Sequence, residues 1–452
     1  MWPLRTMFYF GAFWAGCVAA LFNPIWGIIN YMAVYQMDPT ERWWGMPITE
    51  IGMRLSLIAA LSSLLGLLLA RGKLPRFRPA VSTWELGMVG LFLIAVLNIV
   101  IGVGFTRTAQ TEFEKFWKVL LFTLILGRVA CSRDNLYLVI WTLVLGSLFL
   151  GYDAFTAPMS SFVLGRLENI GGPDFSTTSG AAAHLSAMLP IIGAAFLIAR
   201  NWKWKLLAVV SGGLTVNAII MCRTRSAFIG LVVGALAAFL VAPRVKRFRI
   251  HALLIAGACI AYSITDDQFW LRMGTLTDQQ ALQTDLATVS RKEIWAASLD
   301  ILQDHPLGIG VGNFVQLIGQ YAPQHNKRST HNSLVVCFVE LGAQGGILFL
   351  LMVAGSLRLL HRSYKLAWAS KAPLETQMLA YGLLIALITY FVTALGTQRF
   401  YCESFWWVMM FPLCLYRVVS HEIETCEQAA VCVPPTVDAD EPVGVLGSQY
   451  AY

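Results

Sequence analysis

Two arginines, Arg223 and Arg225, flank Thr224 in a brief break between two long apolar segments. A guanidinium group keeps its charge at any physiological pH and can bind a phosphate through two parallel hydrogen bonds. Two such groups at a membrane boundary could therefore bind a lipid-linked phosphate or pyrophosphate. The alternative is that both side chains only flank a membrane span. We favour the anion site, because arginine is disfavoured on the extracytoplasmic side, where we place this break.

A third arginine, Arg291, lies in the polar stretch 265–330, which separates two apolar segments. Ser290 and Glu293 are spaced as a capping box, which predicts a short helix that begins there and ends before His305. Arg291 would then lie in the first turn of this helix, where backbone N–H groups also favour an anion. A solvated arginine on a loop helix is the alternative.

The sequence HPLGIGVGNF at 305–314 follows this predicted helix. Its glycines are spaced as GxGxG, but a dinucleotide-binding loop of this kind follows a strand and not a helix. We therefore predict a tight turn, whose glycines allow the backbone to approach the rest of the protein closely. Asn313 and Phe314 should begin another short helix.

His331 lies at the start of the next apolar segment, beside Asn332. Its imidazole could accept a proton near neutral pH, although a polar helix cap is the alternative. Glu340 follows nine residues later, roughly 13 Å along a helix that rises 1.5 Å per residue. An ionisable group at that depth in a membrane indicates a functional site, with a structural ion pair as the alternative.

The composition predicts the environment of these residues. Of 452 residues, 57% are hydrophobic and only 13% are charged, which is typical of an integral membrane protein. The net charge of +7 comes from short basic clusters between apolar segments, which does not indicate a nucleic-acid partner. The nine Cys include no CxxC pair, so we predict neither a disulfide framework nor a metal site.

The apolar segments predict an all-α, polytopic bundle of about 12 transmembrane helices. In the N-terminal segment, Asn23-Pro24 could produce either a hairpin or a kinked single span, and we expect no cleavable signal peptide. The predicted segments are 7–36, 49–70, 84–104, 116–130, 135–155, 178–199, 204–221, 226–242, 248–264, 333–360, 376–397 and 402–419.

Two GxxxG pairs occur in these segments, Gly230 with Gly234 and Gly342 with Gly346. Small residues at this spacing are typical of closely packed membrane helices. They carry no information about a substrate.

Basic clusters predict the orientation, since cytoplasmic loops are enriched in Lys and Arg. An even number of predicted crossings separates every pair of clusters, which places the loop 265–330 on the periplasmic or exterior side. The clusters are Arg71/Lys73/Arg76/Arg78, Arg200/Lys203/Lys205, Arg244/Lys246/Arg247/Arg249 and Arg358/Arg362/Lys365/Lys371. We therefore expect one membrane domain over 1–420 and, because the end of the chain is acidic, a disordered cytoplasmic tail over 421–452.

Three motifs in this order resemble the O-antigen ligase and polymerase superfamily of bacterial envelope glycan assembly. CRTRSA at 222–227 is similar to its span-end arginine motif, although the family usually shows Ser-Arg-Gly there. SRKEIW followed by HPLGIGVGNF is similar to its periplasmic-loop signature, and THNSL with the following Glu and Gly at 330–342 is similar to its histidine motif. Together they cover roughly residues 160–360.

The resemblance implies an enzyme of the bacterial inner membrane that needs no cofactor or metal. It implies that Arg225 and Arg291 hold the pyrophosphate of an undecaprenyl-linked glycan and that His331 is the base that activates an acceptor hydroxyl. We expect five further residues to contact substrate, namely Arg166, Arg223, Trp295, Asn332 and Glu340. The expected acceptor is lipid A–core, and membrane lipid surrounds the protein.

Three other functions stay open. A repeat-unit polymerase and a protein O-oligosaccharyltransferase would differ from a ligase in the acceptor alone. A lipid-carrier flippase or transporter belongs to a different class and should place polar groups near the membrane midplane. The candidate residues here gather at one membrane face, which favours an interfacial enzyme.

Overall fold

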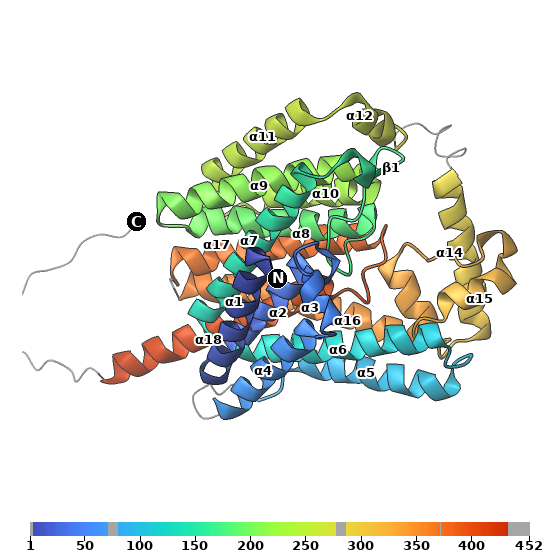
Figure 1. Cartoon of the computed structure of the whole chain (residues 1–452). Coiled ribbons are helices and arrows are strands. Elements are labelled where there is room, and N and C mark those ends of the chain that lie inside the picture. The colour runs from blue at the N-terminus through green and yellow to red at the C-terminus, as the bar shows by residue number, and fades with distance from the viewer. Residues whose placement is uncertain (1–2, 71–79, 277–285, 371, 433–452) are drawn as a thin grey trace, which may run out of the picture.

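The computed structural model describes residues 3–70, 80–276, 286–370 and 372–432, which form a bundle of helices (Figure 1). Among these described residues, eight helices are long and apolar enough to cross a membrane. Two shorter apolar helices, Leu55–Leu69 and Arg225–Leu240, accompany them. Helices suit a membrane because each pairs its own backbone polar groups. The predicted all-α, polytopic fold is confirmed.

Each predicted apolar segment coincides with a helix, and the N-terminal segment forms two helices that meet at Asn23 and Pro24. These helices are α1 (Leu4–Phe22), α2 (Ile25–Met37), α4 (Leu55–Leu69), α5 (Thr83–Ile101), α6 (Arg107–Val129), α7 (Arg133–Phe155), α8 (Thr178–Ile198), α9 (Trp202–Cys222), α10 (Arg225–Leu240), α11 (Arg247–Ile264), α16 (Ser333–Ala369), α17 (Leu374–Ala394) and α18 (Glu403–Cys432). Helices α1 and α2 pack against each other, and Asn30 Nδ2 donates a hydrogen bond to the Phe13 carbonyl at 2.8 Å. The N-terminal segment is therefore a hairpin.

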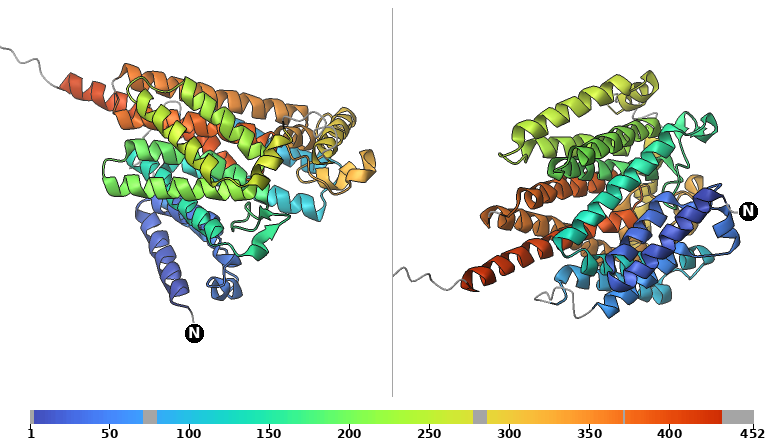
Figure 2. Two further views of the ribbon diagram at one scale, coloured as in Figure 1. Left: turned by 90° about the horizontal axis from the view of Figure 1, so that it is seen from above. Right: turned by 60° about the vertical axis from the view of Figure 1, so that its left-hand side comes forward.

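Helix α17 lies at the centre of the bundle and packs against α8, α10, α16 and α18. Its most apolar window is 78% buried, whereas that of α11 is only 6% buried. Helix α11 accordingly lies at the outer edge of the bundle in Figure 1 and in the right-hand view of Figure 2. Its exposed apolar side chains suit contact with lipid.

The first GxxxG pair brings α10 against α17, as predicted. A Cβ atom at Gly230 would lie 2.0 Å from Thr393 Oγ1, and one at Gly234 would lie 2.1 Å from Thr389 Oγ1. Any larger residue would push the two helices apart. This contact fixes the position of the start of α10, where Arg225 lies.

Further elements connect these helices. They are η1 (Pro39–Glu41), α3 (Met46–Glu50), η2 (Met159–Ser161), β1 (Phe162–Val163), β2 (Arg166–Leu167), α12 (Asp267–Gly274), α14 (Leu286–Asp304), α15 (Phe314–Tyr321) and η3 (Pro323–His325). Strands β1 and β2 pair antiparallel, with Phe162 opposite Leu167. Helices α12, α14 and α15 lie beyond the same end of the bundle, on the right of Figure 1.

Two predictions about boundaries were wrong. Helix α14 begins at Leu286 and not at Ser290, so Ser290 is inside the helix and forms no capping box. Helix α18 continues to Cys432, so the predicted disordered tail begins as helix. Residues 433–452 and the basic cluster at 71–78 lie outside the described residues.

Candidate active site

Arg223 ends helix α9 in a left-handed conformation with φ of 46°. Its guanidinium forms an ion pair with Asp266 and donates hydrogen bonds to the Gly165 carbonyl and the Gln268 side chain. Asp266 also caps α12, since its Oδ1 accepts from Phe269 N at 2.8 Å. Arg223, which we predicted to bind substrate, thus joins the β1–β2 turn to α12.

Arg225, two residues later, is the first residue of α10 and is only 9% exposed. Its Nη1 donates to Thr275 Oγ1 at 3.2 Å. Arg166, on β2, donates from Nε to the Cys222 carbonyl at 3.4 Å. Burial, together with the charge of Arg225, lowers the pKa of Arg166. Two guanidinium groups from distant parts of the chain therefore lie close enough to repel each other, an arrangement that an anion between them would stabilise.

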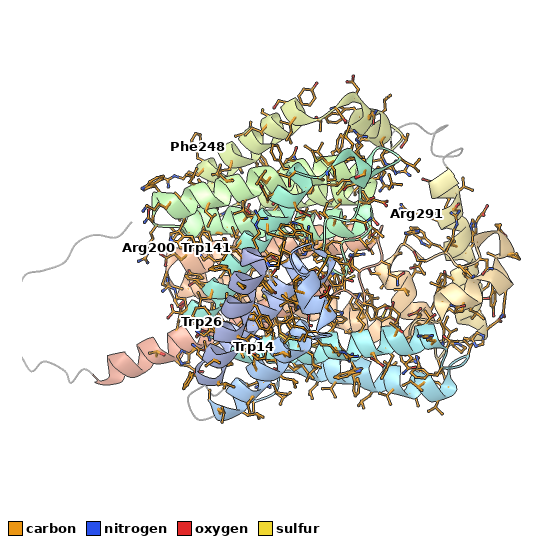
Figure 3. All side chains as sticks on the ribbon, in the orientation of Figure 1. Trp14, Trp26, Trp141, Arg200, Phe248 and Arg291 are labelled. Carbon is orange, nitrogen blue, oxygen red and sulfur yellow. The ribbon has the colours of Figure 1, made fainter. Side chains whose placement is uncertain are left out.

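Helix α14 packs beside the segment that leads into α16. Trp295 Nε1 donates to the Thr330 carbonyl at 2.9 Å. Glu293, predicted to cap the helix, instead binds His325 Nε2. Arg291 lies one turn before Trp295, in the second turn of α14, at the end of the bundle that Figure 3 marks with its label. Helix α14 therefore holds Arg291 near the residues that precede α16.

His331 is half-buried and adopts φ of 49° just before α16. Burial and the nearby charges of Arg291 and Arg328 lower its pKa. The cap of α16 is Asn332, whose Oδ1 accepts from Leu334 N at 2.9 Å. Asn332 was predicted to contact substrate and His331 to be the alternative cap. Within the described residues, no hydrogen bond engages the His331 imidazole.

The loop between α17 and α18 connects the two halves of this site. Thr397 Oγ1 forms a hydrogen bond with Ser226 Oγ at 2.9 Å, and Ser333 Oγ donates to the Thr397 carbonyl at 3.0 Å. Ser226 follows Arg225, and Ser333 lies two residues after His331. The starts of α10 and α16 are therefore held side by side through Thr397.

The predicted glycine turn fills a break in helix α16. Gly342 has φ of 76° and ψ of 178°, which interrupts the helix. Gly310 N donates to the Glu340 carbonyl at 2.9 Å, and Ala343 N donates to the Pro306 carbonyl at 3.0 Å. A Cβ atom at Gly308 would lie 2.5 Å from Gly342 N. Gly342, predicted to pack two helices together, instead gives the turn access to the backbone of α16.

Glu340 binds the same turn through its side chain. Its carboxylate accepts from Gly312 N at 2.9 Å, from Phe314 N at 3.1 Å and from the Tyr401 hydroxyl. Glu340 is only 2% exposed. This residue, predicted to contact substrate, is enclosed by protein and joins the turn after α14 to α16 and to the start of α18.

We expect Glu340→Ala to lower the thermal unfolding temperature strongly. The change leaves two buried backbone N–H groups and the Tyr401 hydroxyl without an acceptor, at about 1–3 kcal/mol for each unsatisfied group. Thermal unfolding of purified protein in detergent measures the effect. Ile347→Ala is the control, because Ile347 lies on the same helix and is 54% exposed. Equal unfolding temperatures for the two variants would contradict the assignment.

A buried ionic cluster beneath the site was not predicted. Lys115 forms an ion pair with Asp174, and Tyr35 donates to Asp174 Oδ2 at 2.7 Å. Arg399 Nη1 donates to the Asp174 carbonyl at 3.0 Å, and its backbone N donates to Ser333 Oγ at 2.7 Å. The cluster fixes the segment that follows Arg166 relative to the start of α16. Charged residues at the edges of apolar segments, such as Lys115 and Arg399, were the available signal.

Comparison with known proteins found a family match over part of the chain. Residues 210–350 match the family model described as O-antigen ligase, and a search of curated proteins found no match. The matched segment extends from α9 into α16 and includes Arg225, Arg291 and His331. Arg166 lies outside it. The three motifs and the family match agree, so this segment of the chain is similar to the O-antigen ligase family.

Proposed function

We propose that this protein is an O-antigen ligase that transfers a glycan from undecaprenyl pyrophosphate to a hydroxyl group of lipid A–core. Transfer takes place at the periplasmic face of the bacterial inner membrane. The family match supports glycan ligation in general. The observation that carries the finer proposal is the placement of His331 beside Arg291 and, through Thr397, beside the start of α10 with Arg225.

In this proposal the arginines bind the donor. Arg225 and Arg166, whose charges already repel each other, receive the pyrophosphate and stabilise it as it leaves. Arg291 also binds the pyrophosphate and places positive charge on the side of His331. The site lies at one end of the bundle, so the lipid tail of the donor can stay in the bilayer.

His331 acts as the general base. Its imidazole takes the proton of the acceptor hydroxyl, whose oxygen forms a bond to the anomeric carbon as the bond from that carbon to the pyrophosphate oxygen breaks. Direct attack inverts the anomeric centre. The lowered pKa keeps the imidazole neutral and able to accept the proton. Because the pyrophosphate is already a good leaving group, the reaction needs neither a nucleotide nor a metal.

A repeat-unit polymerase and a protein O-oligosaccharyltransferase would use the same arginines and His331 with another acceptor. Deletion of the gene, followed by lipopolysaccharide gels, separates these functions. A ligase predicts lost attachment of O-antigen with retained lipid-linked polymer. Single-repeat products would indicate a polymerase, and unchanged lipopolysaccharide with lost glycoprotein would indicate the third function.

A flippase is the alternative from another class. The candidate groups gather at one end of the bundle and not at its middle, which favours the enzyme. Purified protein in liposomes distinguishes the two, because an enzyme transfers sugar to an added acceptor. Movement of lipid-linked glycan without transfer would overturn the proposed function.

The orientation gives a separate test. In a cysteine-reduced variant, Asn326→Cys should react with a membrane-impermeant thiol reagent in intact spheroplasts, because η3 and the site face the periplasm. Arg249→Cys, at the exposed start of α11, should not react until the membrane is permeabilised. Both positions are exposed, so access to the side chain is matched. The reverse pattern would place the site in the cytoplasm.

The charge of Arg328 should set the pH dependence of transfer. Arg328 lowers the pKa of His331, so Arg328→Gln should raise that pKa. Transfer requires neutral imidazole, and the acidic limb of the rate profile should therefore move to higher pH while the rate at the plateau changes little. Single-turnover rates across pH measure the shift. Lys327→Gln, an exposed neighbour, is the control, and a limb that stays in place would contradict the role of Arg328.

A further inference from the structure

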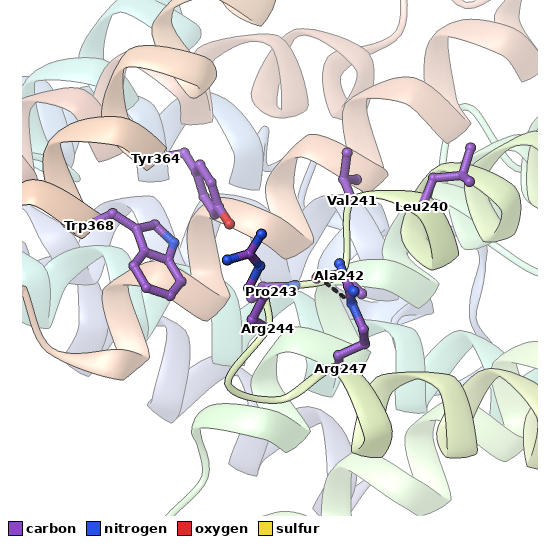
Figure 4. Close-up of a pocket in the computed structure, with 8 residues that line it drawn as sticks. All are labelled: Leu240, Val241, Ala242, Pro243, Arg244, Arg247, Tyr364 and Trp368. Carbon is purple, nitrogen blue, oxygen red and sulfur yellow. Dashed lines mark hydrogen bonds between the residues drawn. The ribbon is translucent and has the colours of Figure 1, made fainter. Parts of the chain in front are cut away.

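A cavity whose lining includes two arginines lies at the end of the bundle opposite the candidate site. Its volume is about 330 Å³. Figure 4 shows its lining, which comes from the end of α10, the connection to α11 and the last turns of α16. The lining residues are Leu240, Val241, Ala242, Pro243, Arg244, Arg247, Tyr364 and Trp368.

Two arginines give this cavity its charge. Arg247 Nε donates to the Ala242 carbonyl at 3.4 Å, which leaves its other N–H groups for a ligand. Arg244 is exposed and extends toward the aromatic rings in Figure 4, and within the described residues no hydrogen bond or ion pair engages its side chain. Neither 225–265 nor 341–374 contains an acidic residue. The elements that line the cavity therefore offer no carboxylate to neutralise these charges.

Two aromatic side chains of α16 face the arginines. The rings of Tyr364 and Trp368 lie edge to face with centroids 6.3 Å apart. Trp368 is 37% exposed. Such amphipathic rings prefer the level of lipid headgroups, where the ring contacts apolar atoms and the O–H or N–H group contacts polar ones. They can donate hydrogen bonds to the same anion that the arginines attract.

Apolar side chains in the lining of the cavity and next to it are exposed. Leu240 is 66% exposed, Val241 47% and Phe248 86%. Phe248 lies far from Arg291, at the other end of the bundle in Figure 3. A soluble anion would leave these side chains uncovered, whereas the acyl chains of a phospholipid would lie over them. The basic cavity and its apolar rim together match a lipid with a charged headgroup.

We propose that this cavity binds the phosphate headgroup of an anionic phospholipid through Arg244 and Arg247, with the acyl chains along α10 and α11. The guanidinium groups contact phosphate oxygens, and Tyr364 and Trp368 enclose the headgroup. Basic pockets between membrane helices bind anionic headgroups in this way. The site is separate from the one proposed to transfer glycan.

Native mass spectrometry of the full-length protein with phosphatidylglycerol tests the site. Arg244→Gln with Arg247→Gln should reduce retained phosphatidylglycerol at least roughly tenfold, since two charge-assisted contacts are lost. The matched control is Arg249→Gln with Arg362→Gln, which removes the same charge from exposed positions outside the cavity. The control should retain the lipid, and phosphatidylcholine should bind weakly to all forms.

Further variants and ligands distinguish a specific headgroup site from misfolding, general surface attraction and binding of a free anion. Arg244→Lys with Arg247→Lys preserves charge and should retain part of the binding, and equal thermal unfolding of all variants excludes misfolding. Equal loss in the control pair would overturn the proposal in favour of general surface attraction. Equal retention of phosphatidylcholine would also overturn it. Displacement of phosphatidylglycerol by millimolar inorganic phosphate would make the cavity a site for a free anion, and the proposal would fail.

Discussion

Replacing His331 with Gln or Asn should slow glycan transfer at least roughly a hundredfold, the lower scale of general-base catalysis. Both amides can form hydrogen bonds in place of the imidazole, but neither can accept the proton of the acceptor hydroxyl. Asn332 caps α16, so the helix start should survive the change. Single-turnover transfer from purified lipid-linked donor to acceptor measures the chemical step.

A measurement of donor binding distinguishes a loss of catalysis from a loss of folding in the His331 variants. Both His331 variants should insert into the membrane and bind lipid-linked donor as the unchanged protein does. Near-normal transfer by both variants would reduce His331 to an acceptor contact. The same transfer assay with EDTA tests whether the reaction needs a metal ion. A large decrease in the transfer rate on addition of EDTA would contradict a metal-independent mechanism.

Hydropathy predicted the membrane helices because each apolar segment must be long enough to cross the bilayer and must pair its own backbone groups. The GxxxG spacing predicted that Gly230 and Gly234 pack closely. The sequence could not predict where α14 begins, because Ser290 and Glu293 fit a helix interior as well as a capping box. In the structure Glu293 binds His325, a partner that lies far along the chain.

The arginine pair illustrates what spacing alone cannot decide. Arg223 and Arg225 are equivalent by residue type, yet the left-handed backbone at Arg223 turns its side chain to Asp266, while Arg225 begins α10. Glu340 was singled out from the sequence because it is an ionisable residue well inside an apolar segment. Its partners, Gly312 and Tyr401, come from other elements, so their contact depends on tertiary structure.

The buried cluster around Asp174 was missed for a related reason. Lys115 lies on α6 and Arg399 lies in the connection between α17 and α18, and both contact Asp174. Neither residue was singled out from the sequence. A charge in such a place is stable only with a partner of opposite sign. Sequence can indicate that a partner is needed, but the fold determines which one it is.

Arg225→Ala and Arg291→Ala should each lower transfer at least roughly a hundredfold. Each change removes charge-assisted hydrogen bonds to the departing pyrophosphate, about 1.5–3 kcal/mol per bond, and each 1.36 kcal/mol is a factor of ten in rate. Arg225 is only 9% exposed, so water cannot easily replace the lost contacts. Initial rates with purified donor, beside thermal unfolding of the same samples, separate lost catalysis from lost stability.

Lysine variants test whether transfer depends on the planar guanidinium group or only on its positive charge. Arg225→Lys and Arg291→Lys keep the positive charge but lose the paired hydrogen bonds, so activity should recover only in part. Arg223→Lys is the matched control, because Lys can keep the ion pair with Asp266, and this variant should transfer at a near-normal rate. Full activity of both Arg225→Lys and Arg291→Lys would argue against paired hydrogen bonds to pyrophosphate. Equal losses of transfer activity in Arg223→Lys and Arg225→Lys would instead mean that the whole break between α9 and α10 acts as one structural unit. The assignment of Arg223 to a loop contact and of Arg225 to a donor contact would then be wrong.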